Sequence, residues 1–218
     1  MTTIPEIVER LIKTRPFLED ALSEGIINIS SLARQLQPEV EYILSKEVQI
    51  GAIVMAIKRM APGFIIHSDL KALKAVESFG DIIIRSNLAV YTYSNTTTLV
   101  EKQSKLLHEI SSKADIFHTF SQGVFETTFI VSRQIQPIIQ SLFSDEMLIA
   151  NSNNLSSITL KLPRENTTIT GFYYFILKKL AWEGINIHEV ISTSHEFTLI
   201  VKDQDIDKAF SILKRITL

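Results

Sequence analysis

The sequence predicts an α+β protein in which an N-terminal helical domain is followed by two tandem ferredoxin-like βαββαβ units. Three observations carry this prediction. Apolar residues in the segment 5–62 recur at i, i+3 and i+4, the spacing of helices that bury one face. After Gly80 the apolar residues alternate with a period of two and are often β-branched or aromatic, which indicates strands. This strand-rich part repeats its own pattern further along the chain, which indicates two copies of one unit.

The composition is that of an ordinary globular protein and excludes several classes of chemistry. The 218 residues are 45% hydrophobic and 21% charged, enough to bury a core without covalent staples. Because the chain has no cysteine, disulfides, thiolate nucleophiles and Cys-ligated zinc are excluded. The net charge of −2 gives no overall attraction to nucleic acid or to a membrane surface. No apolar run approaches the ~20 residues of a membrane span and no signal-peptide pattern opens the sequence, so we expect a cytoplasmic protein without a membrane partner.

The helical domain is expected to occupy residues 1–79. Asn28 or Ser30 can cap a helix there, because both side chains accept hydrogen bonds from the first helical turn. Pro38 is expected to begin a further helix, since proline is tolerated in a first turn. A last short helix is expected after Ser68.

The repeat supplies the expected bounds of the two units, residues 80–152 and residues 153–218. Sliding the chain so that position 88 falls on position 158 superposes their elements without a gap. Residues 88–93 then fall on 158–163, 97–99 on 167–169, 116–120 on 186–190, and 126–131 on 196–201. Each unit therefore has the order strand, helix, strand, strand, helix and short last strand. Right-handed crossovers would place both helices on one face of a four-stranded antiparallel sheet.

The last strand of the second unit is the least regular part of this pattern. Only Ile216, Thr217 and Leu218 remain for it at the end of the sequence. Residues 81–85 form a spare strand before the first unit. We expect the spare strand to complete a sheet elsewhere, with the second unit as the candidate.

A segment of the second unit resembles a known regulatory module. Gly184-Ile185-Asn186-Ile187 is followed by serines and threonines and by the strand 197–201, and Gly171 precedes this segment. This pattern resembles the second ACT module of aspartokinases, where a glycine occupies the turn between the first strand and the first helix. The family usually has proline before that glycine, whereas this chain has Thr170. No two glycines are adjacent, so the Lys-Phe-Gly-Gly type motif of the kinase domain is absent, and the resemblance is to the tandem ACT regulatory region alone.

The resemblance implies that a small amino acid binds between ACT modules, usually at an interface between paired sheets. A helix start suits a ligand carboxylate because it presents unpaired N–H groups and the positive end of the helix dipole. In the second unit the implied ligand-binding residues are Asn166, Thr167, Thr168, Thr170, Gly171, Asn186 and Ile187. The first unit offers Asn95 and Thr97 at the matching turn, with Glu101 where the glycine would fall.

Other roles for these residues stay open at this point. Thr97 and Thr167 are equally suited to cap helices, and Gly171 could serve close packing against a strand. Lysine, threonine, branched-chain and aromatic amino acids all remain candidate ligands.

No catalytic, cofactor or metal motif accompanies these residues. The sequence has no phosphate-binding loop, dinucleotide-binding glycine pattern or nucleophile elbow, and its five histidines lack metal-ligand spacing. We therefore expect a non-catalytic, cofactor-free regulatory protein that senses a small amino acid. Side-by-side pairing of ACT modules is expected to give a homodimer or a higher homo-oligomer.

The alternative function is a ligand-responsive transcriptional regulator. Residues 29–36 look like the first helix of a helix-turn-helix, and residues 50–60 could supply the second. Residues 1–62 contain seven Lys or Arg and eight Asp or Glu, whereas a DNA-binding surface is usually basic. DNA is therefore kept as an alternative partner, and dimerisation or docking to another protein is the favoured role of the helical domain.

Overall fold

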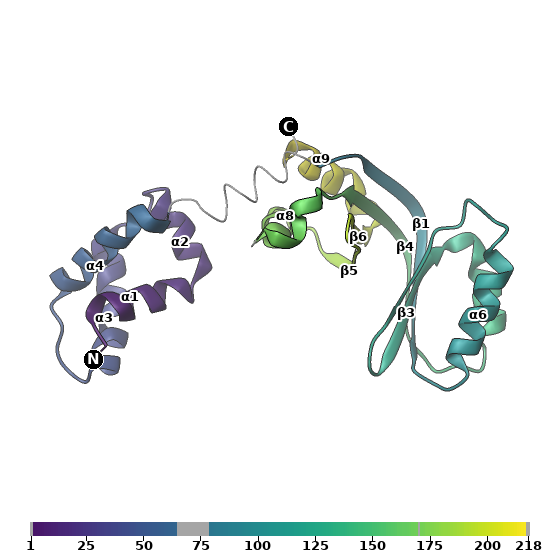
Figure 1. Ribbon diagram of the computed structural model, residues 1–218, viewed down its shortest axis with the longest axis horizontal. Helices are drawn as coiled ribbons and strands as arrows, with labels where there is room; N and C mark the ends of the chain where they lie inside the picture. Colours follow the sequence, from purple (N-terminus) through teal and green to yellow (C-terminus); the bar gives the residue numbers. More distant parts are fainter. Residues whose placement is uncertain (1, 65–78, 170, 217–218) are drawn as a thin grey trace. The chain divides into compact units, whose positions relative to one another are not determined.

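The computed structural model describes residues 2–64, 79–169 and 171–216. The chain divides into two compact units, Met1–His67 and Ser68–Leu218 (Figure 1). The short helix expected after Ser68 lies outside the described residues. Within the described ranges, no helix has the length and apolarity needed to span a membrane.

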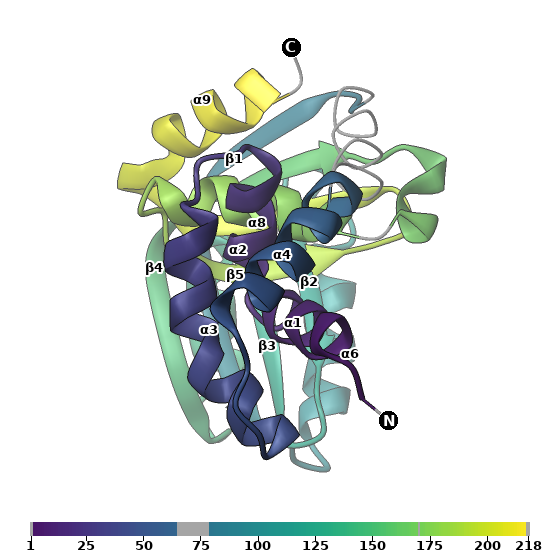
Figure 2. The ribbon, with the colours of Figure 1, turned by 90° about the vertical axis from the view of Figure 1, so that its left-hand side faces the viewer.

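The described part of the N-terminal unit is a bundle of helices (Figures 1 and 2). Its elements are α1 (Ile4–Lys13), α2 (Pro16–Ser23), α3 (Ile29–Leu44) and α4 (Ile50–Phe64). Their shared core includes Ile7, Leu36 and Ile57, all fully buried. Asn28 caps α3, as one of the two expected alternatives, because its side chain accepts a hydrogen bond from the backbone N–H of Ser31 at 3.0 Å.

Pro38 does not begin a helix, contrary to the prediction, because α3 runs through it without interruption. The buried residues Leu36 and Val40 continue one apolar face on both sides of the proline. Pro38 and Arg34 are both exposed, so the Arg34 carbonyl that loses its backbone donor can be solvated. Packing of the apolar face therefore outweighs the missing hydrogen bond.

The second unit contains one antiparallel sheet of six strands with helices packed against it (Figure 1). Its elements are β1 (Ile82–Ser94), α6 (Leu99–Ile110), β2 (His118–Gln122), β3 (Glu126–Ser132), η1 (Arg133–Ile135), α7 (Gln136–Leu142), β4 (Leu148–Lys161), η2 (Arg164–Thr168), α8 (Phe172–Trp182), β5 (Ile187–Ser192), β6 (Glu196–Lys202), η3 (Asp203–Asp205) and α9 (Ile206–Ile216), where η denotes a short 3-10 helix. The strand order across the sheet is β2-β3-β1-β4-β6-β5.

The two longest strands, β1 and β4, each serve two βαββαβ modules. Residues 88–94 of β1 pair with β3 and form the first strand of module 1, whose fourth strand is the first half of β4. Residues 155–161 of β4 pair with β6 and form the first strand of module 2, whose fourth strand is residues 82–85 of β1. The spare strand, residues 82–85, therefore completes the sheet of module 2, as predicted for the second repeat. The expected bound between residues 152 and 153 falls inside β4.

The prediction of a last strand at Ile216 is wrong. Ile216 is the final residue of helix α9, whose buried face includes Ala209, Ile212 and Leu213. Because β1 already supplies the fourth strand of module 2, the end of α9 has no place left beside β4 in that sheet. Thr217 and Leu218 lie outside the described residues.

The ungapped repeat predicts that all elements of the two modules superpose at a single sequence offset. The structure shows that they do not. The Oγ1 atoms of Thr92 on β1 and Thr128 on β3 lie 3.1 Å apart, and Thr159 on β4 and Thr198 on β6 repeat this contact at 2.8 Å. Thr198 is the residue that the ungapped repeat places on Thr128, but Thr159 comes three positions before the residue that it places on Thr92. The extra length lies in the connection from β4 to α8, which contains η2.

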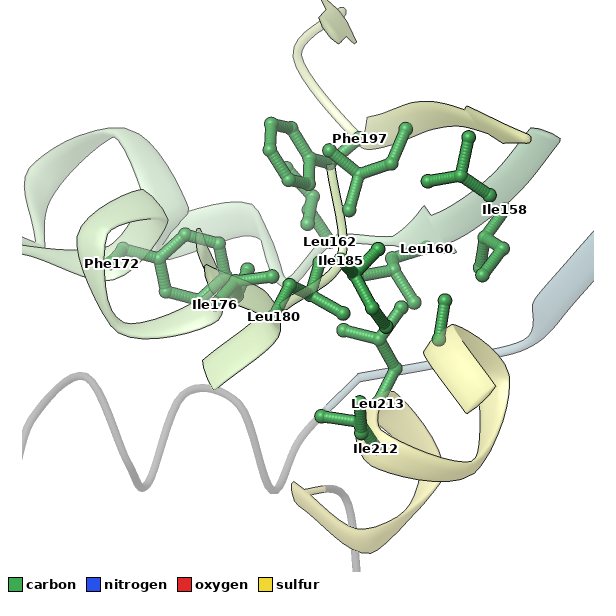
Figure 3. Close-up of a cluster of buried hydrophobic side chains, with 13 residues drawn as sticks. Ile158, Leu160, Leu162, Phe172, Ile176, Leu180, Ile185, Phe197, Ile212 and Leu213 are labelled. Carbon is green, nitrogen blue, oxygen red and sulfur yellow. The ribbon is translucent and has the colours of Figure 1, made fainter. Parts of the chain in front are cut away.

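Each module buries a core beneath its own pair of helices. Figure 3 shows Phe172, Ile176 and Leu180 of α8 facing the strand residues of module 2, with Leu213 of α9 beside them. A separate cluster contains Leu88, Val90, Ile130, Leu155 and Ile200. Because neighbouring residues of a strand point to opposite faces, this cluster lies on the face away from the helices, where the two modules join.

Candidate functional site

The predicted ligand residues fall at three separate places in the sheet. Asn95 and Thr97 follow β1 at the outer end of module 1. Asn166, Thr167, Thr168 and Gly171 follow β4 at the outer end of module 2. Asn186 and Ile187 lie at the opposite end of module 2, where Ile187 pairs with Val201. The outer end of β5 lies at Ser192, roughly 17 Å further along the strand. One small ligand therefore does not reach both groups within a single chain.

Gly171 begins helix α8 with a left-handed backbone, φ 80°. A Cβ atom at this position would meet no atom within 4 Å. The glycine is therefore required by its backbone conformation and not by close packing against a strand, which corrects that alternative. Glycine supplies no side-chain oxygen to the first turn of α8, so an outside acceptor could approach the N–H groups there. Thr170 lies outside the described residues.

Asn95 and Asn166 have equivalent roles in the two modules. Asn95 connects the turn after β1 to the β2–β3 hairpin, and Asn166 connects the turn after β4 to the β5–β6 hairpin. Buried Asn166 donates from Nδ2 to the carbonyls of Pro163 at 2.7 Å and Ser194 at 2.8 Å. Asn95 donates from Nδ2 to the Gly123 carbonyl at 2.9 Å and accepts from Thr127 Oγ1 at 2.6 Å.

The two asparagines differ in their side-chain oxygens. Asn166 Oδ1 is buried and has no hydrogen-bond partner in the described structure. Its equivalent in module 1, Asn95 Oδ1, is satisfied by Thr127, and the residue that the repeat places on Thr127 is the apolar Phe197. Loss of the hydroxyl donor thus leaves a buried acceptor unpaired in module 2.

Thr97 and Thr167 do not cap helices, contrary to the alternative role considered for them. Thr97 is exposed, and its neighbour Thr96 accepts the hydrogen bond from the Leu99 backbone N–H at 3.2 Å. Thr167 is exposed within η2, several residues before α8 begins. Thr168 is also exposed and donates to the Glu165 carbonyl at 2.8 Å. These hydroxyls are accessible, but the structure does not bring them together with Asn186 or Ile187.

Sequence reasoning missed a buried carboxylate at the turn of module 1. The Glu146 side chain is 2% exposed and accepts hydrogen bonds from Thr96 Oγ1 and Thr98 Oγ1, each at 2.6 Å. Lys102 Nζ lies 2.9 Å from Glu146 Oε1 and also pairs with Asp145. The two hydroxyl donors, followed by Lys102, lower the pKa of Glu146 to about 2. Because these partners are far from Glu146 in the sequence, no local pattern indicates the cluster.

A cleft of about 450 Å³ lined mostly by polar and charged residues lies at the inner end of module 2, where the modules join. Its lining residues come from β4, β5, the end of β6 and η3: Ser152, Asn153, Asn154, Leu155, His188, Lys202, Asp203 and Gln204. Asp203 Oδ1 accepts a hydrogen bond from Ser156 Oγ at 2.5 Å, which fixes one wall. Asn154 Oδ1 accepts from Arg133 of module 1 at 3.1 Å, so the opposite module touches the cleft lining. We name this feature the junction cleft.

Solved structures with a similar fold include aspartokinase chains and regulatory subunits of aspartate kinase. The aspartokinase α and β subunit structure matches with a TM-score of 0.51 and 15% identity, over 64% of this chain and 98% of that chain. The ligand-free regulatory subunit of aspartate kinase from Thermus thermophilus matches with a TM-score of 0.52 and 10% identity, over 65% and 100%. Over that share of the chain, the fold is that of an aspartokinase regulatory subunit.

This aspartokinase-type regulatory fold is the one that the sequence resemblance predicted. The chain also matches Clostridium acetobutylicum aspartate kinase with a TM-score of 0.52 and 15% identity, but spans only 35% of that enzyme. No protein-family model and no curated protein matches the sequence. Among the described residues of this aspartokinase-type fold, no group of His, Asp and Glu side chains is arranged to hold a metal ion.

Proposed function

We propose that the chain is a non-catalytic regulatory protein that senses a small amino acid in the junction cleft. The observation that carries this proposal is the pair of neighbouring charges at Lys202 and Asp203 in the cleft lining. An ammonium and a carboxylate that line the same cleft complement the α-carboxylate and α-ammonium groups of a free amino acid. The volume of about 450 Å³ is within the usual range of small-molecule sites.

The position of the cleft supplies a route from binding to regulation. Ser152, Asn153 and Asn154 lie where β4 passes from module 1 into module 2, and Lys202 ends β6 of module 2. A ligand that contacts both walls would favour one angle between the modules over others. The hydrogen bond from Arg133 to Asn154 links this wall to η1 of module 1. The proposed response is therefore a change in how the shared strands bend, without any chemical step.

Self-association through free sheet edges is part of the proposal. Among the strands that the structure describes, residues 82–85 of β1 pair only with β4, and residues 148–152 of β4 pair only with β1. Ile83 and Ile149 lie in these two segments, each paired on one side, and their side chains are 51% and 50% exposed. An apolar, unprotected strand edge favours pairing with another strand, and a second copy of the chain offers the same edges. Light scattering after size-exclusion chromatography tests this part, with a monomeric mass as the contradicting result.

Equilibrium dialysis of the purified chain against each of the twenty amino acids tests the sensing proposal. One amino acid, or a few of similar chemistry, should be retained at millimolar concentration or below. Lys202→Met should abolish this retention, whereas Lys208→Met, which removes an exposed cation paired with Glu183, should leave it intact. Retention of none of the twenty would contradict the proposal. In that case duplex binding with a steep salt dependence would favour the transcriptional alternative.

A further inference from the structure

The carboxylate of Glu146 occupies a closed polar site built entirely from side chains of module 1. Two hydroxyl donors and one ammonium group converge on it, and each contact is between 2.6 and 2.9 Å. The Lys102 side chain is only 14% exposed, so this ion pair is largely shielded from water. Glu146 reaches the site from the short segment between α7 and β4.

Module 2 replaces both charged members of this site. Lys102 lies one helical turn before buried Leu106 on α6, and Phe172 lies one turn before buried Ile176, the residue that the repeat places on Leu106. Figure 3 shows the Phe172 ring turned toward the apolar core, where it cannot bind an anion.

Two matching backbone hydrogen bonds identify the residue of module 2 that corresponds to Glu146. Ser94 N donates to Met147 O at 3.0 Å in module 1, and Lys161 N donates to Asp81 O at 3.1 Å in module 2. The residues before the two acceptors are Glu146 and Gly80. Module 2 therefore has neither the carboxylate nor the ammonium, and Phe79 instead contacts the Phe172 ring, with 5.5 Å between the ring centroids.

We propose that Thr96, Thr98 and Lys102 form a carboxylate-binding site that the chain fills with its own Glu146. Module 1 thereby carries a built-in occupant at its strand-to-helix turn and is closed to outside carboxylates there. Through these contacts Glu146 also links the segment before β4 to the start of α6 without any free ligand. The ligand class of the vacated site is a small monocarboxylate, since two hydroxyls and one ammonium match a single carboxylate group.

Chemical rescue of Glu146→Ala tests this site. The substitution removes a CH2–COO fragment, which has the same heavy atoms as acetate. The variant should melt roughly 10 °C lower than the wild type, because a buried, charge-assisted cluster is lost. Sodium acetate at about 100 mM should restore part of this loss in a concentration-dependent way, since it binds only the folded variant. Sodium chloride at the same ionic strength should not, and the wild type should not respond to acetate.

Two matched variants separate site binding from a general salt effect. Glu101→Ala removes an exposed glutamate paired with Lys105 on the same helix, and acetate should not stabilise it. Adding Lys102→Met to Glu146→Ala should abolish the acetate response. Equal acetate effects on all variants, or none on Glu146→Ala, would overturn the proposal.

A measurement on the wild-type chain keeps the proposal testable if Glu146→Ala does not fold. The carboxyl carbon of Glu146 can be followed by NMR as the pH is lowered. The charged groups around it are Lys102 and Asp145, and Tyr93 nearby stays neutral because burial raises its pKa to about 12. Glu146 should stay ionised until about pH 2, whereas a midpoint near the ordinary value for glutamate would show that the site does not hold the carboxylate.

Discussion

Asn87 and Asn154 occupy the same place in the two modules and share a left-handed backbone, with φ values of 61° and 57°. Each lies directly before a buried leucine, Leu88 or Leu155, and these two leucines pair across β1 and β4. Each asparagine also marks the point where its strand passes from one module to the other. The local kink therefore lets one strand serve two modules of the same sheet, because it reorients the side chains that follow.

Substitution at Asn87 should separate backbone strain from side-chain contacts. Asn87→Val should lower the free energy of unfolding by about 1–2 kcal/mol, because β-branched residues are strained in the left-handed region. Asn87→Gly should be nearly neutral, because glycine adopts this conformation freely. Urea denaturation of both variants checks the difference. Equal destabilisation by valine and glycine would show that the side chain, and not the backbone, matters at this position.

Gly171→Ala should also destabilise the chain through its backbone alone. The position has φ 80° and open space around a Cβ atom, so the cost is the left-handed conformation, about 1–2 kcal/mol. Gly171→Asn should cost less, since asparagine tolerates this region better. Chemical denaturation measures both variants, and a neutral alanine variant would contradict the geometry of the turn.

Asn166→Asp should destabilise module 2 in a pH-dependent manner. The substitution places a carboxylate oxygen against the carbonyls of Pro163 and Ser194, where the amide group now donates. Repulsion favours the protonated acid, so the folded-state pKa of the introduced carboxyl group rises above its unfolded value. The loss of stability should therefore be large at neutral pH and should diminish as the pH falls below that raised pKa.

The matched control for this variant is Asn153→Asp. Asn153 is exposed, and water can replace the hydrogen bond that its Nδ2 donates to Asn151 Oδ1, so its substitution should change stability little at any pH. Thermal denaturation of both variants between pH 4 and 7 makes the comparison. A pH-independent difference between them would contradict the assigned orientation of the Asn166 amide.

The stability of the wild type should depend on pH through Glu146. Hydrogen bonds from Thr96 and Thr98 lower its folded-state pKa from 4.5 to about 2, so the unfolded chain takes up a proton first as the pH falls. The stabilisation is therefore present above about pH 4.5 and is lost progressively as the pH falls toward 2. Glu146→Gln should be less stable at pH 7 and should show a shallower acid dependence. Urea denaturation across this range measures both, and identical pH profiles would contradict the lowered pKa.

Local pattern was enough to predict most helices and strands and the repeat, because these depend on periodicity within each element. It wrongly began a helix at Pro38 and placed a strand at Ile216. The spare strand at residues 81–85 was predicted as well, since the count of strands left it unpaired. The sequence offset that relates β1 to β4 differs from the one that relates the later strands, and this difference was not predicted. Alternating strands look alike when they are shifted, and only pairs such as Thr92 with Thr128 fix the register.

The candidate sites were harder to predict because their residues are distant in the sequence. Asn95 and Asn166 were identified as turn residues, but their hairpin contacts depend on the fold of each module. The sequence around Glu146 contains no pattern that marks it as a site residue, because its role depends on contacts with Thr96 and Lys102. The junction cleft exists only where the shared strand β4 meets β6 and η3, which no linear motif describes.

The central claim is that a free amino acid binds in the junction cleft and stabilises the folded chain. Its most direct test is thermal denaturation of the wild type, Lys202→Met and Lys208→Met in each of the twenty amino acids at about 10 mM. We predict that at least one amino acid raises the melting temperature of the wild type and of Lys208→Met, but not of Lys202→Met. A melting temperature that no amino acid changes, or a shift that survives in Lys202→Met, would contradict the claim.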